Sequence, residues 1–345
     1  MPRRPRKYAI RAFLRGGDCV MAMIRLATCL AGPLAIWGCL ALWYRAPGGR
    51  GLKILAVAAW AGLSLLALLG LSGIHPALAA AAFAAAFGAL LLWWHRLKPS
   101  NERDWADDVA EMTSGTVAGD RVVLHNVRNF DWRGDADYTQ RWETRSYDLS
   151  QLRSVDMIMS YWTIRPIAHV LISFGFDGGD HVVFSVEIRR EKNEAFSAIG
   201  GFFKEFELCI LAADERDVIG LRTNVRGEDD YLYRIRIPEP AMRSLFLAYI
   251  EQANALVRTP RFYNTITVNC TTLIYHMMSC IVGHLPLDYR LLFSGYLPGY
   301  VYRVGGLDGR YTLEQLRSFG RITERARRSD RGGGFSADIR QGVPV

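Results

Sequence analysis

Three long apolar runs near the amino terminus constrain this chain more than any other feature. They are Leu26–Tyr44, Ile54–Ser72 and Pro76–Trp94. About 20 consecutive apolar residues cross the hydrocarbon core of a bilayer, and three such runs in succession are hard to bury in a soluble domain. The third run closes with the sequence WWHRLK, a combination of aromatic and basic residues that suits the headgroup zone. We therefore predict three transmembrane helices within residues 1–98.

The first run has an alternative interpretation as a cleaved signal peptide. It is long for a signal sequence, and no A-x-A-like cleavage site follows it cleanly. Six basic residues and no acidic residue occupy residues 1–15. Because basic segments stay on the cytoplasmic side, we expect the amino terminus in the cytoplasm and everything after Lys98 outside. Arg45, Arg50 and Lys53 would then also lie outside, against that bias.

The net charge of +8 is concentrated at the two ends of the chain. Residues 320–345 carry six basic and three acidic groups, which leaves the middle of the chain close to neutral. A nucleic-acid binder needs a basic face on its folded domain, so the charge pattern argues against that class. The basic ends suit lipid headgroups or solvent.

Residues 99–322 have the pattern of an α+β domain with a largely antiparallel sheet. The expected strands are Arg121–Val127, Arg141–Leu149, Ile167–Phe176, His181–Arg189, Glu207–Ala213 and Tyr231–Ile237. The expected helices are Ala241–Val257 and Leu313–Phe319. The clearest signal is a hairpin whose two apolar strands flank the Gly178-Gly179 turn. The Gly- and Arg-rich tail, residues 323–345, is predicted to be mobile.

The segment Arg261–His276, RFYNTITVNCTTLIYH, holds the first candidate for chemistry. Its β-branched run Thr265–Val268 predicts an extended segment, and Asn269 is a good N-cap for a helix that starts at Cys270. A thiol at the mouth of a helix is easier to ionise, and the free N–H groups there can bind an oxyanion. Cys270 is therefore a candidate nucleophile. The alternative is a small apolar residue at the start of a core helix.

A catalytic cysteine needs a base, and His169 is the best placed of the seven histidines because it interrupts an apolar strand. If the hairpin turn is centred near Gly178, positions across the two strands sum to about 356, which sets His169 opposite Glu187. An imidazole beside a carboxylate completes the parts of a Cys-His-acid site. The alternatives are a satisfied core imidazole, and a salt bridge from Glu187 to Arg189 or Arg190.

Other polar clusters support weaker hypotheses. Two acidic clusters lie among arginines, where we expect ion pairs or solvated loops rather than a cation site. These clusters are Asp214, Glu215 and Asp217, and Glu228, Asp229 and Asp230. No spacing of cysteine and histidine fits zinc, so we expect no metal and no cofactor. Cys209 could pair with Cys280, but nothing requires it, and Cys209 fits a buried strand residue.

Five segments taken in order resemble a known family: IAHVLISFGF, SVEIRRE, DERDVIGLRT, DDYLY and RFYNTITVNCTT. The resemblance is to the bacterial Lnb N-terminal periplasmic domain family, and it covers roughly residues 100–320. It implies a circularly permuted papain-type (NlpC-like) fold, similar in layout to lecithin retinol acyltransferase. In that layout the strands that carry the histidine and the third polar residue precede the helix that carries the cysteine. His169, Glu187 and Cys270 match this order.

The resemblance also implies an activity, that of a thiol acyltransferase in the bacterial inner membrane with its catalytic domain in the periplasm. An acyl chain would pass from a membrane phospholipid, through a Cys270 thioester, to the amino group of a lipoprotein or peptide. His169 would move the protons and Glu187 would hold the imidazole. The expected substrate and oxyanion residues are Asn269, Tyr263 and Asn264.

Two other functions use the same residues. A periplasmic cysteine amidase or peptidase acting on cell-wall or other peptides shares the chemistry and differs in the acyl donor, although no wall-binding module is seen. A membrane-tethered binding protein with a decayed site is harder to reconcile with an intact Cys, His and Glu. The segment Ser294–Arg303, which contains Tyr296, Leu297, Tyr300 and Tyr302, is expected to help the site reach lipid.

Overall fold

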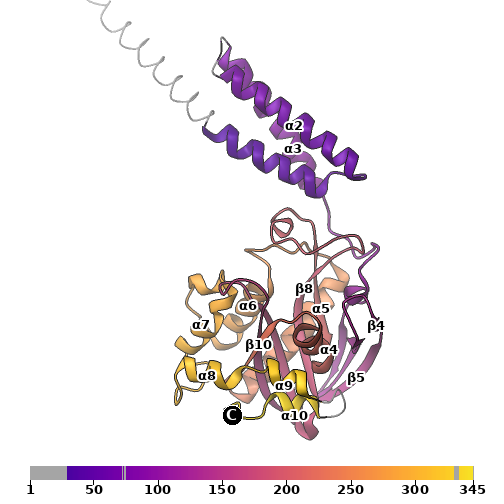
Figure 1. The fold of residues 1–345 in the computed structure, drawn as a ribbon, viewed down its shortest axis with the longest axis vertical. Helices are drawn as coiled ribbons and strands as arrows, with labels where there is room; N and C mark the ends of the chain where they lie inside the picture. The colour runs from indigo at the N-terminus through magenta and orange to yellow at the C-terminus, as the bar shows by residue number, and fades with distance from the viewer. Residues whose placement is uncertain (1–28, 72, 74, 330–333, 345) are drawn as a thin grey trace, which may run out of the picture. The chain divides into compact units, whose positions relative to one another are not determined.

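The computed structural model describes residues 29–71, 73, 75–329 and 334–344. The chain divides into two compact units (Figure 1). The first unit comprises Met1–Lys98 with Phe203–Glu205, and the second comprises Pro99–Phe202 with Phe206–Val345. The division between Lys98 and Pro99 separates the apolar amino-terminal sequence from the mixed sequence that follows it.

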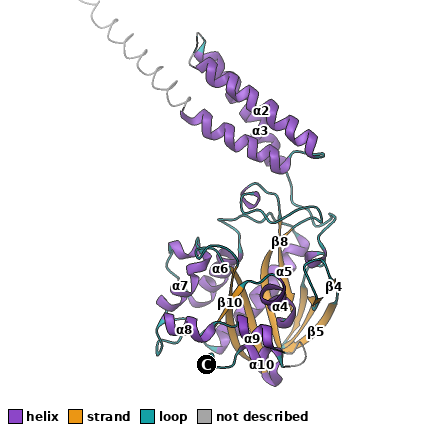
Figure 2. Ribbon diagram, in the orientation of Figure 1, coloured by secondary structure: helices purple, strands orange, loops and turns teal. Residues whose placement is uncertain are grey.

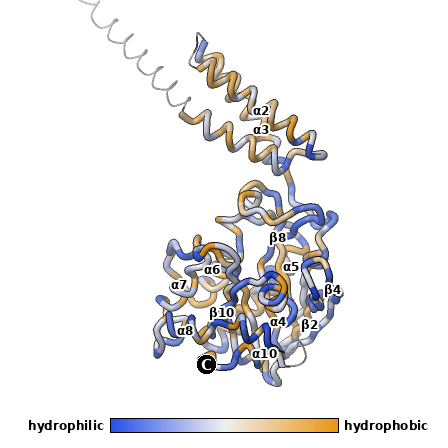
Figure 3. The backbone as a smooth tube through the Cα atoms, in the orientation of Figure 1, coloured by the Kyte–Doolittle hydropathy of each residue, from blue (hydrophilic) through white to orange (hydrophobic). Residues whose placement is uncertain are grey.

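The first unit is built of apolar helices. Residues 29–45 are helical and are followed by α2 (Arg50–Leu71) and α3 (Pro76–Arg96). α2 and α3 are long and apolar enough to cross a bilayer, and Figure 3 shows much of both helices in the hydrophobic colours. Two predicted spans are thus matched by helices of the required length, whereas Leu26–Tyr44 begins outside the described residues. Pro76 opens α3, where its missing N–H is not needed.

Trp60 of α2 connects the helices of this unit. Its indole Nε1 donates a hydrogen bond to the carbonyl oxygen of Ala35 at 2.9 Å, and its ring centroid lies 5.8 Å from that of Phe83 in α3. An indole N–H without a partner would be costly in an apolar environment. The hydrogen bond to Ala35 therefore allows a large aromatic ring to fill the space between the helices.

The second unit is organised around an eight-stranded sheet with the order β1-β2-β9-β8-β7-β6-β10, in which β5 also pairs with β2. Its strands are β1 (Ser114–Ala118), β2 (Arg121–Arg128), β5 (Trp142–Asp148), β6 (Leu152–Tyr161), β7 (His169–Phe176), β8 (His181–Arg189), β9 (Glu207–Ala213) and β10 (Asp229–Arg234). All neighbours are antiparallel except β2 and β9. A separate two-stranded ribbon pairs β3 (Asp131–Trp132) with β4 (Tyr138–Thr139).

Helices cover both faces of this sheet (Figure 2). On one face lie α5 (Glu239–Arg258) and α6 (Cys270–Val282), and there Phe246 of α5 packs edge-on against Phe174 and Phe184 of the sheet. Residues two apart on a strand point to the same face. β7 and β8 can therefore contribute alternate residues to two separate cores.

The opposite face is covered by α4 (Glu215–Gly220), α9 (Thr323–Arg328) and α10 (Phe335–Ile339). Leu171 and Val183 of the sheet belong to this second core and are fully buried. Helices on both sides of a mostly antiparallel sheet confirm the predicted α+β class.

Most predicted elements of this unit are confirmed to within a few residues. β2, β5, β7, β8, β9 and β10 occupy the predicted strands, and α5 and α8 (Leu313–Gly320) occupy the predicted helices. β1, β6 and α4 are not among the predicted elements. In β6 the polar Ser154, Asp156 and Ser160 alternate with apolar residues, and all three are buried. The polar half of this strand faces buried ion pairs rather than water, so its pattern is less obvious in the sequence.

The extended segment predicted over Thr265–Val268 is a turn instead. The Asn264 side-chain Oδ1 accepts hydrogen bonds from the backbone N–H groups of Ile266 at 3.0 Å and Thr267 at 2.9 Å. The backbones of Asn264 and Val268 pair with each other across this turn. An asparagine side chain that bonds the backbone two residues ahead competes with strand formation, and here it overrides the β-branched residues.

The prediction of a mobile tail over residues 323–345 is wrong for the described part of the tail. α9 and α10 bury Ala326, Phe335 and Ile339 against the sheet. The Arg340 guanidinium bonds two buried carboxylates. The Gly- and Arg-rich composition indicated solvation, but a few apolar residues and one paired arginine are enough to hold these short helices in place.

The segment Ser294–Arg303, expected to reach lipid, turns inward. It contains α7 (Leu297–Arg303), in which Leu297 and Tyr300 are buried in the core. The Tyr300 hydroxyl donates to the carbonyl oxygen of Pro286 at 2.9 Å. Aromatic residues in a Gly-rich segment are compatible with either a core or a membrane surface, and here the buried hydroxyl finds its partner inside the domain.

Candidate active site

Cys270 is the first residue of α6 and is buried, with 8% of its surface exposed. The Asn269 side-chain Oδ1 accepts hydrogen bonds from the N–H groups of Thr271 at 2.8 Å and Thr272 at 2.9 Å. The Thr272 hydroxyl in turn accepts from the Asn269 N–H at 2.9 Å, which completes a capping box. The predicted helix start and N-cap are confirmed. The cap fixes the Cys270 thiol at the positive end of the helix.

The hairpin of β7 and β8 holds the predicted base and acid. Its register pairs Leu171 with Ser185, and positions across the two strands sum as predicted. His169 Nε2 lies 3.1 Å from Glu187 Oε1 and 2.7 Å from Ser185 Oγ. Ser185 Oγ donates a hydrogen bond to Glu187 Oε1 at 2.7 Å. The predicted pairing of His169 with Glu187 is therefore confirmed, and Ser185 joins the two.

The Cys270 thiol meets this hairpin at His169. Burial alone would raise the pKa of the thiol, but a hydrogen bond to His169 and the charge of its imidazolium outweigh burial and lower that pKa. The backbone N–H of Val170 lowers the pKa of the thiol further. For His169, burial opposes protonation, whereas Glu187 and the bond to Cys270 favour it and raise the pKa to about 9. The arrangement favours a thiolate-imidazolium pair.

Arg222 forms ion pairs with the acid of this group, Glu187, and with Glu228. Its guanidinium donates to Glu187 Oε1 at 3.1 Å and to Glu228 Oε2 at 3.2 Å. Burial would raise the pKa of the Glu187 carboxyl, but His169 and then Arg222 outweigh burial and lower it. Arg222 sits in a one-turn π-helix, Leu221–Val225, a widened turn of the kind often found at functional sites.

Ser185 and Arg222 are absent from the predicted site. A signal for Ser185 exists in the sequence, since it is a polar residue two positions before Glu187 and so shares its strand face. The sequence contains no comparable signal for Arg222. Its position depends on a π turn, which no residue pattern predicts. The contacts of Arg222 are visible only in the folded chain.

The three predicted substrate and oxyanion residues separate into two roles. Asn269 is fully engaged, because Oδ1 caps α6 and Nδ2 donates to the Thr265 carbonyl oxygen at 2.7 Å. Asn264 holds the preceding turn through its own Oδ1. The two asparagines thus hold the cap of α6 and the turn before it, and their role toward an oxyanion stays a prediction. Tyr263 lies close enough to Cys270 that burial, and then the charge of the thiolate, raise the pKa of its phenol.

The acidic clusters form ion pairs, as expected; those of Asp217, Glu215 and Glu228 are buried, whereas Asp214 and Asp229 pair with arginines in partly exposed positions. Asp217 bonds Arg128 at 2.9 Å, and Glu215 bonds Arg340. Among the described residues, no group of three or more His, Cys, Asp or Glu side chains could hold a metal ion. Cys209 is a free, buried thiol on β9, in agreement with a strand residue in the core.

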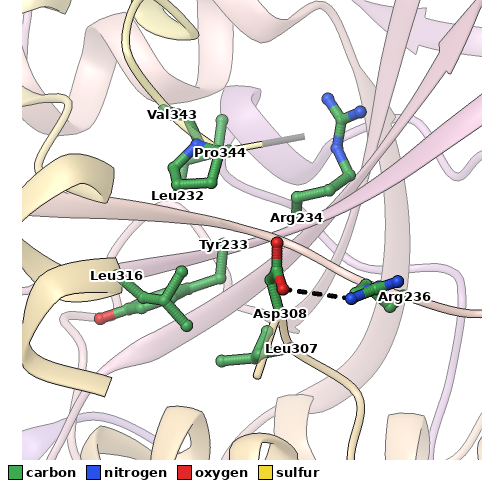
Figure 4. A pocket seen from close by; sticks show the side chains of 9 residues that line it. All are labelled: Leu232, Tyr233, Arg234, Arg236, Leu307, Asp308, Leu316, Val343 and Pro344. Atoms are coloured by element: carbon green, nitrogen blue, oxygen red, sulfur yellow. Dashed lines mark hydrogen bonds and ion pairs between the residues drawn. The ribbon is translucent and has the colours of Figure 1, made fainter. Parts of the chain in front are cut away.

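A small cavity lies away from these residues, beside β10 (Figure 4). Its lining residues are Leu232, Tyr233, Arg234, Arg236, Leu307, Asp308, Leu316, Val343 and Pro344. Its volume of about 10 Å³ is that of a single water molecule. Its lining contains no cysteine, serine or histidine, and its size excludes an organic substrate.

Comparison with known proteins gives one match. Residues 138–295 match the family model of the Lnb N-terminal periplasmic domain. Over these residues the chain is similar to the Lnb N-terminal periplasmic domain family. The match includes His169, Glu187 and Cys270 and confirms the resemblance predicted from the sequence. No curated protein and no solved structure matches the chain. Together with the two helices of spanning length, the domain indicates a membrane-associated protein with a periplasmic part.

Proposed function

We propose that this chain is a membrane-anchored periplasmic thiol acyltransferase. The observation that carries the proposal is the buried Cys270 thiol at a helix mouth, whose pKa is lowered by the His169 imidazole, itself 3.1 Å from Glu187. The family resemblance supports a phospholipid as acyl donor and the amino group of a lipoprotein or peptide as acceptor. It also supports a permuted papain-like arrangement and a bacterial inner-membrane location with several spans.

The first half-reaction forms a thioester. The Cys270 thiolate attacks the ester carbonyl carbon of the phospholipid, and the carbonyl oxygen becomes an oxyanion. We assign the stabilisation of that oxyanion to the Cys270 N–H at the start of α6 and to the Tyr263 phenol, whose pKa responds to the thiolate charge. When the carbon–oxygen bond breaks, the His169 imidazolium gives its proton to the departing alkoxide. The products are an acyl-Cys270 thioester and a lysophospholipid.

The second half-reaction returns the enzyme to its starting state. The amine of the acceptor attacks the thioester carbonyl, and neutral His169 takes a proton from the attacking nitrogen. The Cys270 thiolate leaves, and it is again paired with the imidazolium. Glu187 and Ser185 bond Nε2 of His169. Nδ1 is thus the ring nitrogen left for the proton transfers.

The test is a trapped acyl adduct. Purified full-length protein in proteoliposomes is incubated with phospholipid that carries a labelled acyl chain, and labelled protein is measured before and after hydroxylamine. We expect a hydroxylamine-sensitive adduct that is absent in Cys270→Ser and strongly reduced in His169→Ala. Cys280→Ser is the matched control, since Cys280 is an exposed free thiol on the same helix. No adduct in wild type, with cleavage of a peptide substrate instead, would favour a cysteine amidase or peptidase.

A further inference from the structure

Most of the large apolar side chains that the second unit exposes are grouped rather than scattered. They lie on four segments: 162–167, 196–202, 264–267 and 282–293. Leu287 is 83% exposed, Ile164 60% and Phe196 59%. Elsewhere in the described part of this unit, the exposed large apolar side chains are Val117, Val257, Val304 and Phe319. Scattered apolar residues are ordinary, whereas a concentration of them marks an interaction surface.

The four segments, which we call the apolar rim, are joined to one another. The Trp162 and Phe196 rings at 6.2 Å and the Thr265 hydroxyl to the Ala198 carbonyl at 2.9 Å join three of the segments. The fourth, 282–293, is tied to segment 162–167 just beyond its end, where the Gly295 N–H donates to the Pro166 carbonyl at 2.9 Å. Segment 162–167 leads directly into His169, and segment 264–267 precedes Cys270 by two residues. The apolar rim therefore borders the thiol and its base.

The charge and side-chain types of the rim fit a lipid surface. Trp162 and Tyr289 are exposed aromatic residues, and each has an arginine close by in its segment, Arg165 and Arg290. The acidic residue of the rim, Asp288, is nearly buried and bonds Arg303 at 2.6 Å. Aromatic and basic residues together are typical of the headgroup zone, and a net positive surface attracts anionic lipids.

We propose that the apolar rim docks on the surface of the phospholipid bilayer and inserts its apolar side chains among the lipids. Docking would bring ester groups, which lie at the boundary of headgroup and hydrocarbon, to the thiol between the rim segments. That the docked lipid is the acyl donor rests on the proposed function, whereas the contact with the bilayer does not. The partner is a lipid surface, and the same chain carries two helices able to anchor it to one.

The test measures lipid contact directly. Full-length protein with a fluorescent unnatural amino acid at residue 287 is reconstituted into liposomes that contain lipid with a doxyl quencher on the acyl chain. The matched control carries the same label at residue 180, an exposed position beside the turn at the opposite end of β7 and β8. β7 separates the two ends by about 25 Å at 3.3 Å per residue. We expect loss of fluorescence at residue 287 and little change at residue 180.

Either of two results would overturn the docking surface: no quenching at residue 287, or equal quenching at both positions. The outcome is independent of the acyl-adduct experiment. Quenching at residue 287 without an adduct would keep the docking surface and remove the proposed reaction. An adduct without quenching would keep the proposed reaction and remove the docking surface. Leu287→Gln with Leu292→Gln adds a second measure, since it should slow adduct formation from vesicles and leave Cys270 alkylation by a small reagent unchanged.

Discussion

Two buried ionic networks lie side by side on β7 and its neighbours, and they differ in one respect that matters for chemistry. The tail network joins Arg340 to Asp156 at 2.9 Å and to Glu215 at 2.5 Å. The site network joins Arg222 to Glu187 and Glu187 to His169. An arginine keeps its proton at any ordinary pH, whereas an imidazole exchanges its proton near neutrality. The tail network is therefore fixed in charge, and the site network can pass a proton to Cys270.

The comparison shows that a buried ion pair alone does not identify a functional site. Both networks have carboxylates with little or no solvent contact, and both would be costly to break. What separates them is a titratable group next to a nucleophile. Changes to the tail network should therefore act on stability, and changes to the site network should act mainly on reactivity.

The largest effect is expected for Arg340→Ala. It leaves the buried Glu215 and Asp156 without their cation, and breaking a buried pair in this way costs about 3–5 kcal/mol. Denaturant unfolding of the second unit within the full-length protein measures the loss in free energy of unfolding. Arg321→Ala is the matched control, because Arg321 pairs with Asp229 at the surface and should change stability little. Wild-type stability in Arg340→Ala would remove the tail network as a stabilising element.

The next effect concerns His169→Ala. Removal of a positioned acid–base group slows reactions by about 100-fold or more, so the rate of acyl-adduct formation should fall by at least that factor. Unfolding should change much less than in Arg340→Ala. The adduct rate is corrected for the fraction of folded protein. If His169→Ala loses stability but keeps this corrected rate, His169 has a structural role like that of Arg340.

A smaller effect is expected for Ser185→Ala. The Ser185 hydroxyl contacts both His169 and Glu187, and loss of one charge-assisted hydrogen bond of about 1.5 kcal/mol corresponds to about tenfold in rate. Because the imidazolium is then held less firmly, the pH at which Cys270 becomes reactive should rise. Ser185→Thr keeps the hydroxyl and should restore both measures. An unchanged pH profile in Ser185→Ala would limit Ser185 to a packing role.

The hairpin shows why part of the site can be predicted from the sequence. A tight turn at Gly178 sets the strand register, and the register then determines which side chains face each other. The start of α6 is equally local, since Asn269 and Thr272 form their cap within four residues. Both predictions depend on short-range rules that hold in isolation.

The rest of the site depends on contacts between distant segments. Arg222 reaches Glu187 because of a π turn, and Arg340 reaches Asp156 across 184 positions of sequence. The composition of the tail predicted a mobile segment, because arginine in a Gly-rich segment usually indicates solvation. β6 has no plain strand pattern because it buries polar residues, among them Asp156 against Arg340 and Ser160 against Glu228 and Asp230. Such pairings depend on the tertiary fold, and no local sequence pattern predicts them.

The smallest effect is expected for Asn269→Ala. Loss of this N-cap should destabilise the protein by about 1 kcal/mol, and Asn269→Ser should recover most of that loss. Adduct formation should change little, because both polar atoms of Asn269 are engaged within the cap. A fall in rate of about 100-fold in a folded variant would instead return Asn269 to the oxyanion site.

The central claim is that His169 lowers the pKa of the buried Cys270 thiol below that of an ordinary thiol. The direct measurement is the rate of Cys270 alkylation by iodoacetamide between pH 5 and pH 10, followed on the Cys270 peptide by mass spectrometry. The account predicts a wild-type midpoint below that of an ordinary thiol. In His169→Ala burial is unopposed by the imidazolium, so the midpoint should move above the ordinary value and the rate near pH 7 should fall by at least about tenfold. An ordinary midpoint in wild type, or the same midpoint in His169→Ala, would contradict it.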